Sequence, residues 1–379
     1  FYAESGGQIG DSGQLIGIEE TIDIVDTKKE NDLFIHKAKR LPKNLKGIFK
    51  AVVNQDKRGL IENNHTATHL LHAALREVLG DHVQQRGSLV NDQSLRFDFS
   101  HFAKLSAEEL LAVEQQVNQK IRNNIPLVER RSVPIEKAKE EGAMALFGEK
   151  YGDHVRMILF DAPYSVELCG GTHVKATGHI GVFKITSESS ISTGVRRIEA
   201  ITADMAESFL WQKIGLLDQI EQTLKHPSDT LKALQVLFNE KNELINQIEA
   251  FNKAKTKELK KTMMEAVEVY KGVNIISFEG AFPDAASVKE IAFDLKREMG
   301  PLILLIGAKV GGKPLLTVMI EEELVQQKDL NASVLIRKMA KSIQGGGGGQ
   351  DFYATAGGKN TEGLTAALEI GNQILKEKI

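Results

Sequence analysis

Hydrophobic and polar positions alternate with different periods along the chain, and each period predicts a type of element. Residues 1 to about 50 carry short alternating runs between glycine-rich turns, which is typical of a small β-barrel. Between Ala67 and Val78 apolar residues instead recur three and four positions apart, and Gly80 stops the pattern, which predicts a helix. Leu95, Phe97 and Phe99 then alternate with polar residues, so a hairpin with one buried face is expected around them.

The middle of the chain continues this mixed pattern and then becomes purely helical. Ser106 with Glu109 three positions later is a capping-box pattern, which predicts a helix to about Asn123. From about 204 to 270, Lys, Glu, Gln and Leu dominate, and Pro227 divides the run into two helices. These helices are expected to form either an antiparallel hairpin or a dimerising coiled coil. Strands are expected before them, at 155–160, 179–189 and 195–203.

The last part of the chain alternates strand and helix patterns and is expected to be a separate α/β unit. The strands are predicted at 273–280, 302–310 and 315–323, and the helices at 284–299, 331–343 and 361–376. The glycine run Gly345–Gly349 lies between the last two helices. A glycine run alone favours a flexible linker, but within a compact α/β pattern it equally favours a backbone loop that meets a phosphate or a polynucleotide.

The whole pattern predicts a mixed α+β protein of four parts. They are a small N-terminal β-barrel at 1–50, a mixed α/β domain at 51–205, a helical hairpin or coiled coil at 206–270, and a C-terminal α/β domain at 271–379. A length of 379 residues and a hydrophobic content of 42% are sufficient for several cores.

Composition and charge narrow the classes of protein that fit. The longest apolar run, Leu302–Ile306, has the length of a strand, so neither a membrane span nor a signal peptide is expected. The chain begins at Phe1 rather than at a methionine, which predicts a fragment or a processed product. A formal net charge of −3 gives no global electrostatic reason to bind nucleic acid. Any RNA contact is therefore expected from local basic stretches, at 37–46, 253–261 and 196–197.

Two short motifs a hundred residues apart supply the ligands of a metal site. His65 and His69 lie one helical turn apart on one face, and Cys169 and His173 lie in a Cys-Gly-Gly-Thr-His turn whose glycines let the backbone fold around an ion. Three imidazoles and a thiolate form a complete tetrahedral zinc set. Cys169 is the only cysteine of the sequence, which excludes an intramolecular disulfide and favours a reducing, cytoplasmic compartment.

The residues next to these histidines exclude two other arrangements. His72 lies seven positions after His65, roughly 10 Å along the helix axis, which is too far for both to bind one ion. A metalloprotease helix needs Glu directly after the first histidine as general base, and Thr66 occupies that position. A zinc protease is therefore not expected.

Four segments, in the same order and almost from end to end, resemble the C-terminal half of the alanyl-tRNA synthetases. FYAESGGQIGDSG is similar to the start of that family's editing module, and NHTATHLLHAAL with LCGGTH is similar to its zinc site. ISTGVRRIEAITA resembles the strand that closes the module. GGGGGQDFYATAGG is similar to the glycine-rich motif of the C-terminal domain that the family shares with DHH-type phosphoesterases. The amino-acid activation part of such an enzyme would precede Phe1.

The resemblance implies an editing activity with one Zn²⁺ per chain, held by His65, His69, Cys169 and His173. Such a module hydrolyses the ester of tRNA(Ala) that is wrongly charged with serine or glycine. It is needed because an activation pocket shaped for alanine rejects these two amino acids poorly. A polar pocket can select serine because alanine would leave its hydrogen-bonding groups unpaired.

Two residues match positions that the family uses near the substrate amino acid, and the resemblance implies catalytic roles for them. They are Thr68, on the histidine helix, and Gln85, on the strand that follows. Their ordinary structural roles would be a hydroxyl bonded back to its own helix and an exposed strand amide.

The resemblance also implies that tRNA(Ala) is the partner, with its acceptor end at the editing site and its outer corner at the C-terminal domain. Arg196 and Arg197 are candidates for phosphate contacts, although alternating strand faces favour an internal ion pair for one of them. Gly346, Gly347 and Gly348 are the candidates in the C-terminal domain. Homodimer contacts are expected from the helical and C-terminal segments, and none with a membrane.

Two questions stay open at this stage. Four protein ligands leave zinc no position for water, so the ion is expected to organise the pocket while a water near Gln85 and Thr68 attacks the ester. Alternatively, dissociation of Cys169 or expansion to five ligands would let zinc activate that water. The function of the whole chain also has two alternatives to an editing part of a synthetase. One is a freestanding trans-editing deacylase, and the other is a non-catalytic tRNA-binding and dimerisation module with structural zinc.

Overall fold

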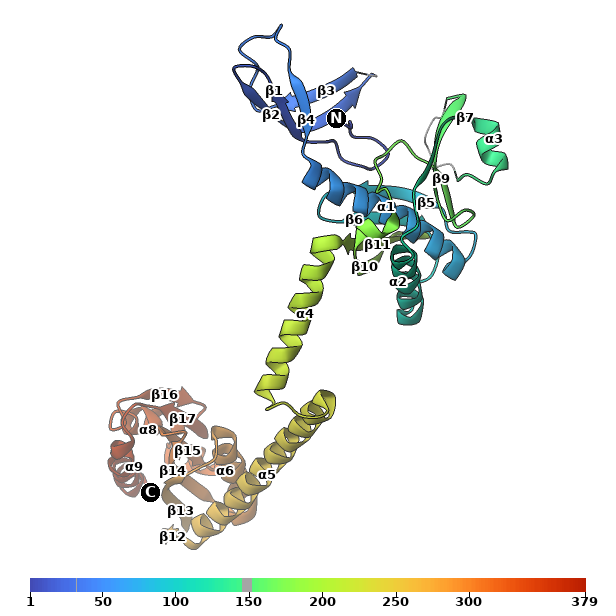
Figure 1. The fold of residues 1–379 in the computed structure, drawn as a ribbon. Helices are drawn as coiled ribbons and strands as arrows, with labels where there is room; N and C mark the ends of the chain where they lie inside the picture. Colours follow the sequence, from blue (N-terminus) through green and yellow to red (C-terminus); the bar gives the residue numbers. More distant parts are fainter. Residues whose placement is uncertain (32, 145–151) are drawn as a thin grey trace. The chain divides into compact units, whose positions relative to one another are not determined.

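The structure is a computed structural model that describes residues 1–31, 33–144 and 152–379 (Figure 1). The chain forms two compact units, Phe1–Thr223 and Leu224–Ile379, and each combines β-sheets with helices, so the predicted mixed α/β character is confirmed. In the described part of the chain, no helix is both long and apolar enough to cross a membrane. The domain boundaries predicted near residues 50, 205 and 270 stay predictions.

The first unit begins with an open antiparallel sheet of four strands and not with a barrel. The strands, in the order β3-β2-β1-β4, are β1 (Gly13–Ile16), β2 (Thr21–Glu30), β3 (Leu33–Ala38) and β4 (Lys50–Val53). Among the described residues β3 pairs with β2 and β4 pairs with β1, and these two edge strands do not pair with each other. The predicted barrel is therefore wrong. Closure into a barrel needs strands that tilt and stagger enough for the two edges of the sheet to meet.

The predicted histidine helix and hairpin form the centre of the first unit. Helix α1 (Gln55–Leu79) begins at the N-cap Asn54 and ends at Gly80. Strands β5 (Gln85–Val90) and β6 (Leu95–Ser100) form the predicted hairpin. They lie in a sheet of order β10-β11-β6-β5, completed by β10 (Phe183–Ser192) and β11 (Val195–Thr202).

One face of this sheet is covered by α1 and by α2 (Ala107–Arg122). The hairpin residues Leu95, Phe97 and Phe99 are completely buried there, as their alternation predicts. The capping box is also confirmed, because the Ser106 hydroxyl accepts from the Glu109 backbone N–H and the Glu109 carboxylate accepts from that of Ser106.

A three-stranded sheet leads the chain into the cysteine motif. Its strands are β7 (Val128–Pro134), followed by the short helix α3 (Ile135–Glu140), then β8 (His154–Phe160) and β9 (Ser165–Leu168). After the motif, the 3₁₀ helix η1 (Thr177–Ile180) occupies part of the strand predicted at 179–189, which begins only at Phe183. The Thr177 hydroxyl holds this turn by donating to the Lys120 carbonyl.

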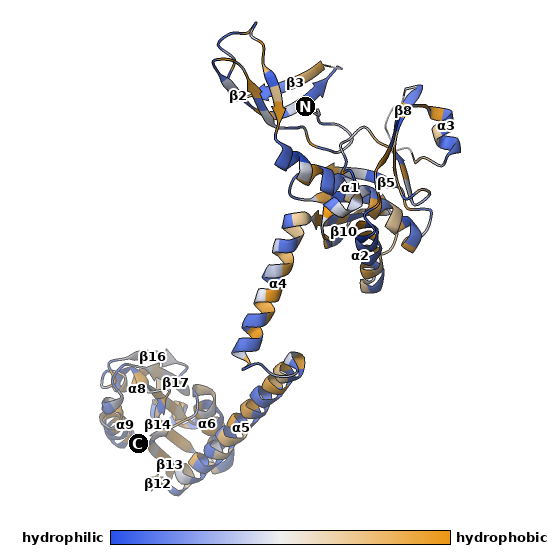
Figure 2. Cartoon of the chain, in the orientation of Figure 1, coloured by the Kyte–Doolittle hydropathy of each residue, from blue (hydrophilic) through white to orange (hydrophobic). Residues whose placement is uncertain are grey.

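The predicted helical segment consists of α4 (Ala203–Thr223) and α5 (Thr230–Glu265), separated at Pro227 as predicted. It ends five residues earlier than predicted, because residues 267–270 form strand β12 (Val267–Tyr270). Valine and tyrosine favour strands, and β12 pairs with the next strand of the second unit. Figure 2 shows apolar positions along both helices.

The second unit is a six-stranded sheet in the order β12-β13-β14-β15-β17-β16 with helices on both faces. Every strand and helix predicted from 273 to 376 is present, although some of their ends are shifted. For example, residues 322 and 323 were predicted as strand, but they begin helix α7. The further elements are β13 (Val273–Ala281), α6 (Ala285–Met299), β14 (Leu302–Val310), β15 (Lys313–Ile320), α7 (Glu322–Lys328), α8 (Ala332–Met339), β16 (Gly346–Gly349), β17 (Tyr353–Gly357), η2 (Thr361–Gly363) and α9 (Leu364–Lys378).

The glycine run is an edge strand, so both predictions for it, a linker and a loop, are wrong. Residues 346–349 form β16, which pairs antiparallel with β17. A Cβ atom on Gly347 would lie 2.1 Å from the Thr355 carbonyl oxygen, and one on Gly349 would lie 2.3 Å from that of Tyr353. Glycine is therefore needed here because the backbones of β16 and β17 approach each other too closely for a side chain.

Candidate metal centre

The four predicted metal ligands lie together inside the first unit. The donor atoms of His65, His69, Cys169 and His173 are all within 4.8 Å of one another, and the four residues are buried. Cys169 Sγ lies 3.5 Å from His65 Nε2 and 3.3 Å from His173 Nε2. Tetrahedral zinc, with bonds of roughly 2.0–2.3 Å, would separate its donor atoms by about 3.3–3.6 Å. The residues present therefore fit a zinc ion.

Local structure brings the two halves of this set together. The four-residue step on α1 places His65 and His69 on one face, while β9 ends directly before Cys169. Gly171 lies against the first histidine, since a Cβ atom there would be 2.1 Å from His65 Cε1. The motif therefore needs glycine at this position so that the loop can approach the helix.

Each imidazole has a polar neighbour at its Nδ1 atom, which leaves Nε2 to face the centre. Hydrogen bonds to the nitrogen that does not bind the metal orient metal-binding histidines in general. The neighbours are Gln8 Oε1 at 2.7 Å from His65, Glu167 Oε2 at 3.2 Å from His69 and Thr66 Oγ1 at 3.2 Å from His173.

Glu167 supports two histidines at once. Besides its contact with His69, this buried carboxylate accepts from Nδ1 of His72 at 3.0 Å. His72 is thus a neighbour of the centre and not part of the ligand cluster, as its distance along the helix predicts. Burial raises the pKa of the Glu167 carboxyl, but its electrostatic interactions with His69 and His72 and the hydrogen bond from His72 outweigh burial, so the net pKa is lowered.

Burial also decides the charge of the histidine ligands. It lowers the pKa of His65 and of His173 well below 6.5, and it lowers the pKa of His69 as well. The three imidazoles are therefore neutral at pH 7, and neutral imidazole is the form that binds metals.

Arg156 holds the cysteine turn from the other side. Its guanidinium donates to the carbonyl oxygens of Cys169 at 3.0 Å and of Gly171 at 2.5 Å, and it is itself paired with Glu129. The hydrogen bond from Arg131, followed by that from Arg156, lowers the pKa of Glu129 to about 2, so this carboxylate is ionised at neutral pH.

Several of these supporting residues were not predicted from the sequence: Gln8, Thr66, Glu129, Arg156 and Glu167. For two of them a signal exists, because Gln8 lies in the glycine-rich GGQIGDSG segment and Glu167 lies two positions before Cys169. A polar residue next to a metal motif is a reasonable candidate for orienting its ligands. The role of Gly171 agrees with the prediction that the glycines of the cysteine turn let the backbone fold around an ion.

The predicted catalytic residues lie on α1 and β5, and their roles stay predictions. Thr68 is buried on α1, and its hydroxyl donates to the Asn64 carbonyl at 2.8 Å, so it has the ordinary helical bond. Gln85 is the half-buried first residue of the edge strand β5, opposite Phe99.

Both predicted tRNA-binding arginines are engaged in ion pairs within the first unit. Arg197 donates to both carboxylate oxygens of Asp98, at 2.7 and 2.8 Å, and Arg196 pairs with Glu188. The sequence predicted an internal pair for one arginine, and the structure shows one for each. Their contact with RNA stays a prediction.

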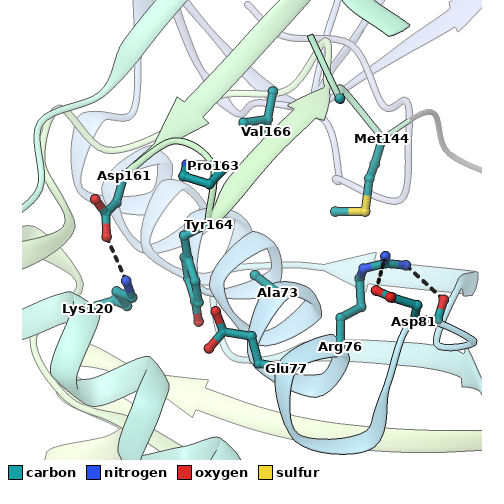
Figure 3. Close-up of a pocket in the computed structure, with 11 residues that line it drawn as sticks. Ala73, Arg76, Glu77, Asp81, Lys120, Met144, Asp161, Pro163, Tyr164 and Val166 are labelled. Atoms are coloured by element: carbon teal, nitrogen blue, oxygen red, sulfur yellow. Dashed lines mark hydrogen bonds and ion pairs between the residues drawn. The ribbon is translucent and has the colours of Figure 1, made fainter. Parts of the chain in front are cut away.

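A cavity of about 520 Å³ lies beside the second half of α1 and contains none of the predicted site residues (Figure 3). Its basic side chains are matched by acids. Lys120 pairs with Asp161 at 2.6 Å, and Arg76 pairs with Asp81 at 2.7 Å. The hydroxyl of Tyr164, also in the lining, donates to the Leu70 carbonyl at 3.2 Å. The lining of the cavity thus includes none of the four metal-ligand residues, and both of its basic side chains are paired with acidic residues of the lining.

Two family models match parts of the chain. Residues 150–199 match the family described as the threonyl and alanyl tRNA synthetase second additional domain, and residues 272–377 match the DHHA1 domain. The C-Ala domain of Aquifex aeolicus alanyl-tRNA synthetase is 24% identical, with 27% of this chain and 96% of that chain covered and a TM-score of 0.23. The family match within the first unit, together with the sequence relatives described next, places the chain among the aminoacyl-tRNA synthetases.

Relatives whose sequences are similar over almost the whole chain are alanine–tRNA ligases. The alanine–tRNA ligase of Cytophaga hutchinsonii is 51% identical over 376 residues, which are 99% of this chain and 43% of that protein. The alanine–tRNA ligase of Christiangramia forsetii is 49% identical over 377 residues, again 99% of this chain and 43% of that protein. The predicted resemblance to the C-terminal half of alanyl-tRNA synthetase is therefore confirmed. The chain spans less than half the length of these relatives.

Proposed function

We propose that this chain is the editing and tRNA-binding portion of an alanyl-tRNA synthetase and that it hydrolyses Ser-tRNA(Ala) and Gly-tRNA(Ala). The observation that carries the proposal is the buried set of three histidines and a cysteine, with a polar neighbour at every imidazole. ATP-dependent ligation of alanine is proposed for the parent enzyme and not for this part of it. A cytoplasmic location is part of the proposal, since the single cysteine suits a reducing compartment.

The proposed ion is Zn²⁺, one per chain, held by His65, His69, Cys169 and His173. When bound, it supplies a fixed positive charge and ties α1 to the cysteine turn. The neutral imidazoles and the thiolate suit zinc better than magnesium or calcium, which prefer oxygen ligands. The primary proposal assigns bond cleavage to neighbouring polar groups, because four protein ligands saturate a tetrahedral ion.

In this proposal Thr68 and Gln85 act on the mischarged amino acid and on water. The Thr68 hydroxyl already donates to its own helix, so its free lone pair can only accept a hydrogen bond, as from the serine hydroxyl or the ammonium group. The Gln85 amide can both orient a water and donate to the developing oxyanion of the ester carbonyl. Alanine lacks the hydroxyl, so the pocket groups that pair with serine would lose a partner.

A deacylation assay on seryl-tRNA(Ala) tests the proposal. The zinc-loaded chain should hydrolyse the ester, and Gln85→Ala should reduce kcat by about 10²–10³-fold, as loss of one oxyanion donor does. Gln84→Ala, an exposed amide one position earlier, is the matched control and should retain activity. Cys169→Ala should lose bound zinc and activity together.

The same assay separates the other candidate functions. An absence of ester hydrolysis by the intact, zinc-loaded chain would contradict the editing proposal and favour a tRNA-binding and dimerisation module with structural zinc. A freestanding trans-editing deacylase is less favoured, because the similar ligases are more than twice as long as the region they share with this chain.

For the second unit we propose contact with the outer corner of tRNA(Ala) through β16 and its surroundings. Gly346 and Gly347 are exposed on this edge strand, where they offer backbone groups without side chains. The Arg337 guanidinium of α8 lies close by, since a Cβ atom on Gly348 would be 3.7 Å from it. A basic side chain beside open backbone suits a phosphate oxygen. Homodimer contacts through exposed apolar residues of α5, such as Ile248 and Phe251, belong to the same proposal.

A further inference from the structure

Gln8 contacts both halves of the metal centre although it lies far from them in sequence. It precedes β1 by five residues and is completely buried. Its Oε1 atom lies 2.7 Å from His65 Nδ1 and 2.9 Å from the backbone nitrogen of Thr172, and its Nε2 donates to the Thr172 hydroxyl at 3.0 Å. One amide therefore joins α1 to the cysteine turn.

These contacts determine where the proton of His65 lies. A backbone N–H can only donate, so the Gln8 atom that faces Thr172 N must be the oxygen. The same oxygen faces His65 Nδ1, which must then carry the ring proton. In neutral imidazole the lone pair is consequently on Nε2, the atom that lies 3.5 Å from Cys169 Sγ.

The backbone on both sides of Gln8 is fixed to the edge of β5. The Val90 N–H donates to the Gly7 carbonyl at 2.7 Å, and the Ile9 N–H donates to the Val90 carbonyl at 3.1 Å. Gly7 has a φ of +83°, and a Cβ atom there would lie 2.6 Å from the Ser88 carbonyl oxygen, so only glycine fits. The loop is thus held in the position from which its glutamine reaches the centre.

We propose that Gln8 is a positioning residue of the metal centre, which holds His65 in its metal-binding tautomer and anchors the cysteine turn, so that metal binding and docking of the Ser5–Gly10 loop stabilise each other. The inference rests on the metal site of the proposed function. Because the linkage is thermodynamic, it acts in both directions: the docked loop tightens metal binding, and the bound metal favours the docked loop.

Metal affinity of glutamine variants tests the positioning role. In competition with a chelator for Zn²⁺ and Co²⁺, Gln8→Ala should bind about 10–100-fold more weakly than the unmodified chain, as is typical when a metal-binding histidine loses the partner of its other ring nitrogen. Gln8→Glu keeps an acceptor oxygen for His65 and for Thr172 and should stay within about threefold of the unmodified chain. Gln14→Ala removes an exposed amide on β1 that bonds Asp23 and is the matched control.

Two results would overturn the positioning role: a folded Gln8→Ala chain with unchanged affinity, or Gln8→Glu as weak as Gln8→Ala. Long-range ¹H–¹⁵N spectra of the metal-free chain add a readout that a merely structural residue would not move, because no metal then fixes the tautomer. The unmodified chain should have the His65 proton on Nδ1 and Gln8→Ala should lose this preference, whereas a proton on Nε2 in the unmodified chain would contradict the assignment.

Hydrogen exchange of the unmodified 379-residue chain tests the linkage without any substitution. Removal of zinc should speed exchange of the Ile9 and Thr172 amides, whose bonds hold the loop and its contact, while amides of β15 in the second unit stay protected. Unchanged protection of Ile9 and Thr172 in the metal-free chain would overturn the linkage. Ester hydrolysis plays no part in these measurements, so failure of the editing activity and failure of this inference are distinguishable.

Discussion

Gly171 shows how closely the metal centre is packed at the scale of one atom. A Cβ atom there would lie 2.1 Å from His65 Cε1 and 2.7 Å from Gln8 Oε1. Gly170, its neighbour in the same turn, is exposed, and a Cβ atom there would meet nothing within 4 Å. The two glycines thus differ in packing but not in type, which makes them a matched pair for mutation.

We expect Gly171→Ala to displace the His65 ring, weaken zinc binding by about 10–100-fold and destabilise the chain by about 1–3 kcal/mol through overpacking. Gly170→Ala should change stability by less than about 0.5 kcal/mol, as most surface substitutions do. Chelator competition and thermal unfolding of both variants measure the two effects. Equal losses for the two alanines would mean that backbone freedom of the turn, and not the contact with His65, makes glycine necessary.

At this scale the sequence predicts what is local and misses what packing brings together. The ligands follow from a helical step and a five-residue turn, so the motifs suffice to find them. Gln8 is 57 residues from His65, and Asp98 is 99 residues from Arg197. Neither partnership has a pattern along the chain, which is why the second ion pair of the arginines and the supports of the centre were not predicted.

At the scale of elements, predictions that depend on neighbouring residues are again correct, and those that depend on distant contacts are wrong. The capping box at Ser106 and the buried face of β6 depend on residues a few positions apart, and both are confirmed. Closure of the N-terminal sheet depends on whether β3 meets β4, which no local pattern reports. The glycine run was wrongly predicted because its composition indicates only how flexible the segment would be by itself. In the structure, pairing with β17 orders it as a strand.

Gly346 and Gly347 separate the structural role of β16 from its proposed role in RNA binding. A Cβ atom on Gly347 would lie 2.1 Å from the Thr355 carbonyl oxygen, whereas one on Gly346 would meet nothing within 4 Å. Gly347→Ala should therefore destabilise the β16–β17 pair by about 1–3 kcal/mol, seen as faster hydrogen exchange in β17. Gly346→Ala should leave exchange unchanged.

Affinity for tRNA(Ala) then tests whether the exposed backbone contacts RNA. If it does, Gly346→Ala weakens binding through its methyl group although the strand is intact. Unchanged affinity of Gly346→Ala would mean that the glycines have only a structural role, which is to allow β16 to approach β17 closely.

At the scale of the whole chain, the two compact units divide the chemistry. All four donor residues of the metal centre lie in Phe1–Thr223, which has its own core around α1 and β6. The second unit has separate cores on the two faces of its sheet and contains the glycine strand. A net charge of −3 says nothing about this division, because charge summed over the chain hides where the basic residues lie.

Removal of residues 224–379 should therefore change RNA binding without changing the metal centre. The chain 1–223 should still bind one zinc ion, because it holds every donor and every supporting side chain of the centre. Its affinity for tRNA(Ala) should fall, and so should the salt dependence of binding, since each lost phosphate contact lowers the slope of log K against log [salt] by about 0.7–0.9. Filter binding at several salt concentrations and metal analysis of both chains measure these quantities. An unchanged slope and affinity would show that the second unit makes no phosphate contact and would leave tRNA binding to the first unit, where both candidate arginines already pair with carboxylates.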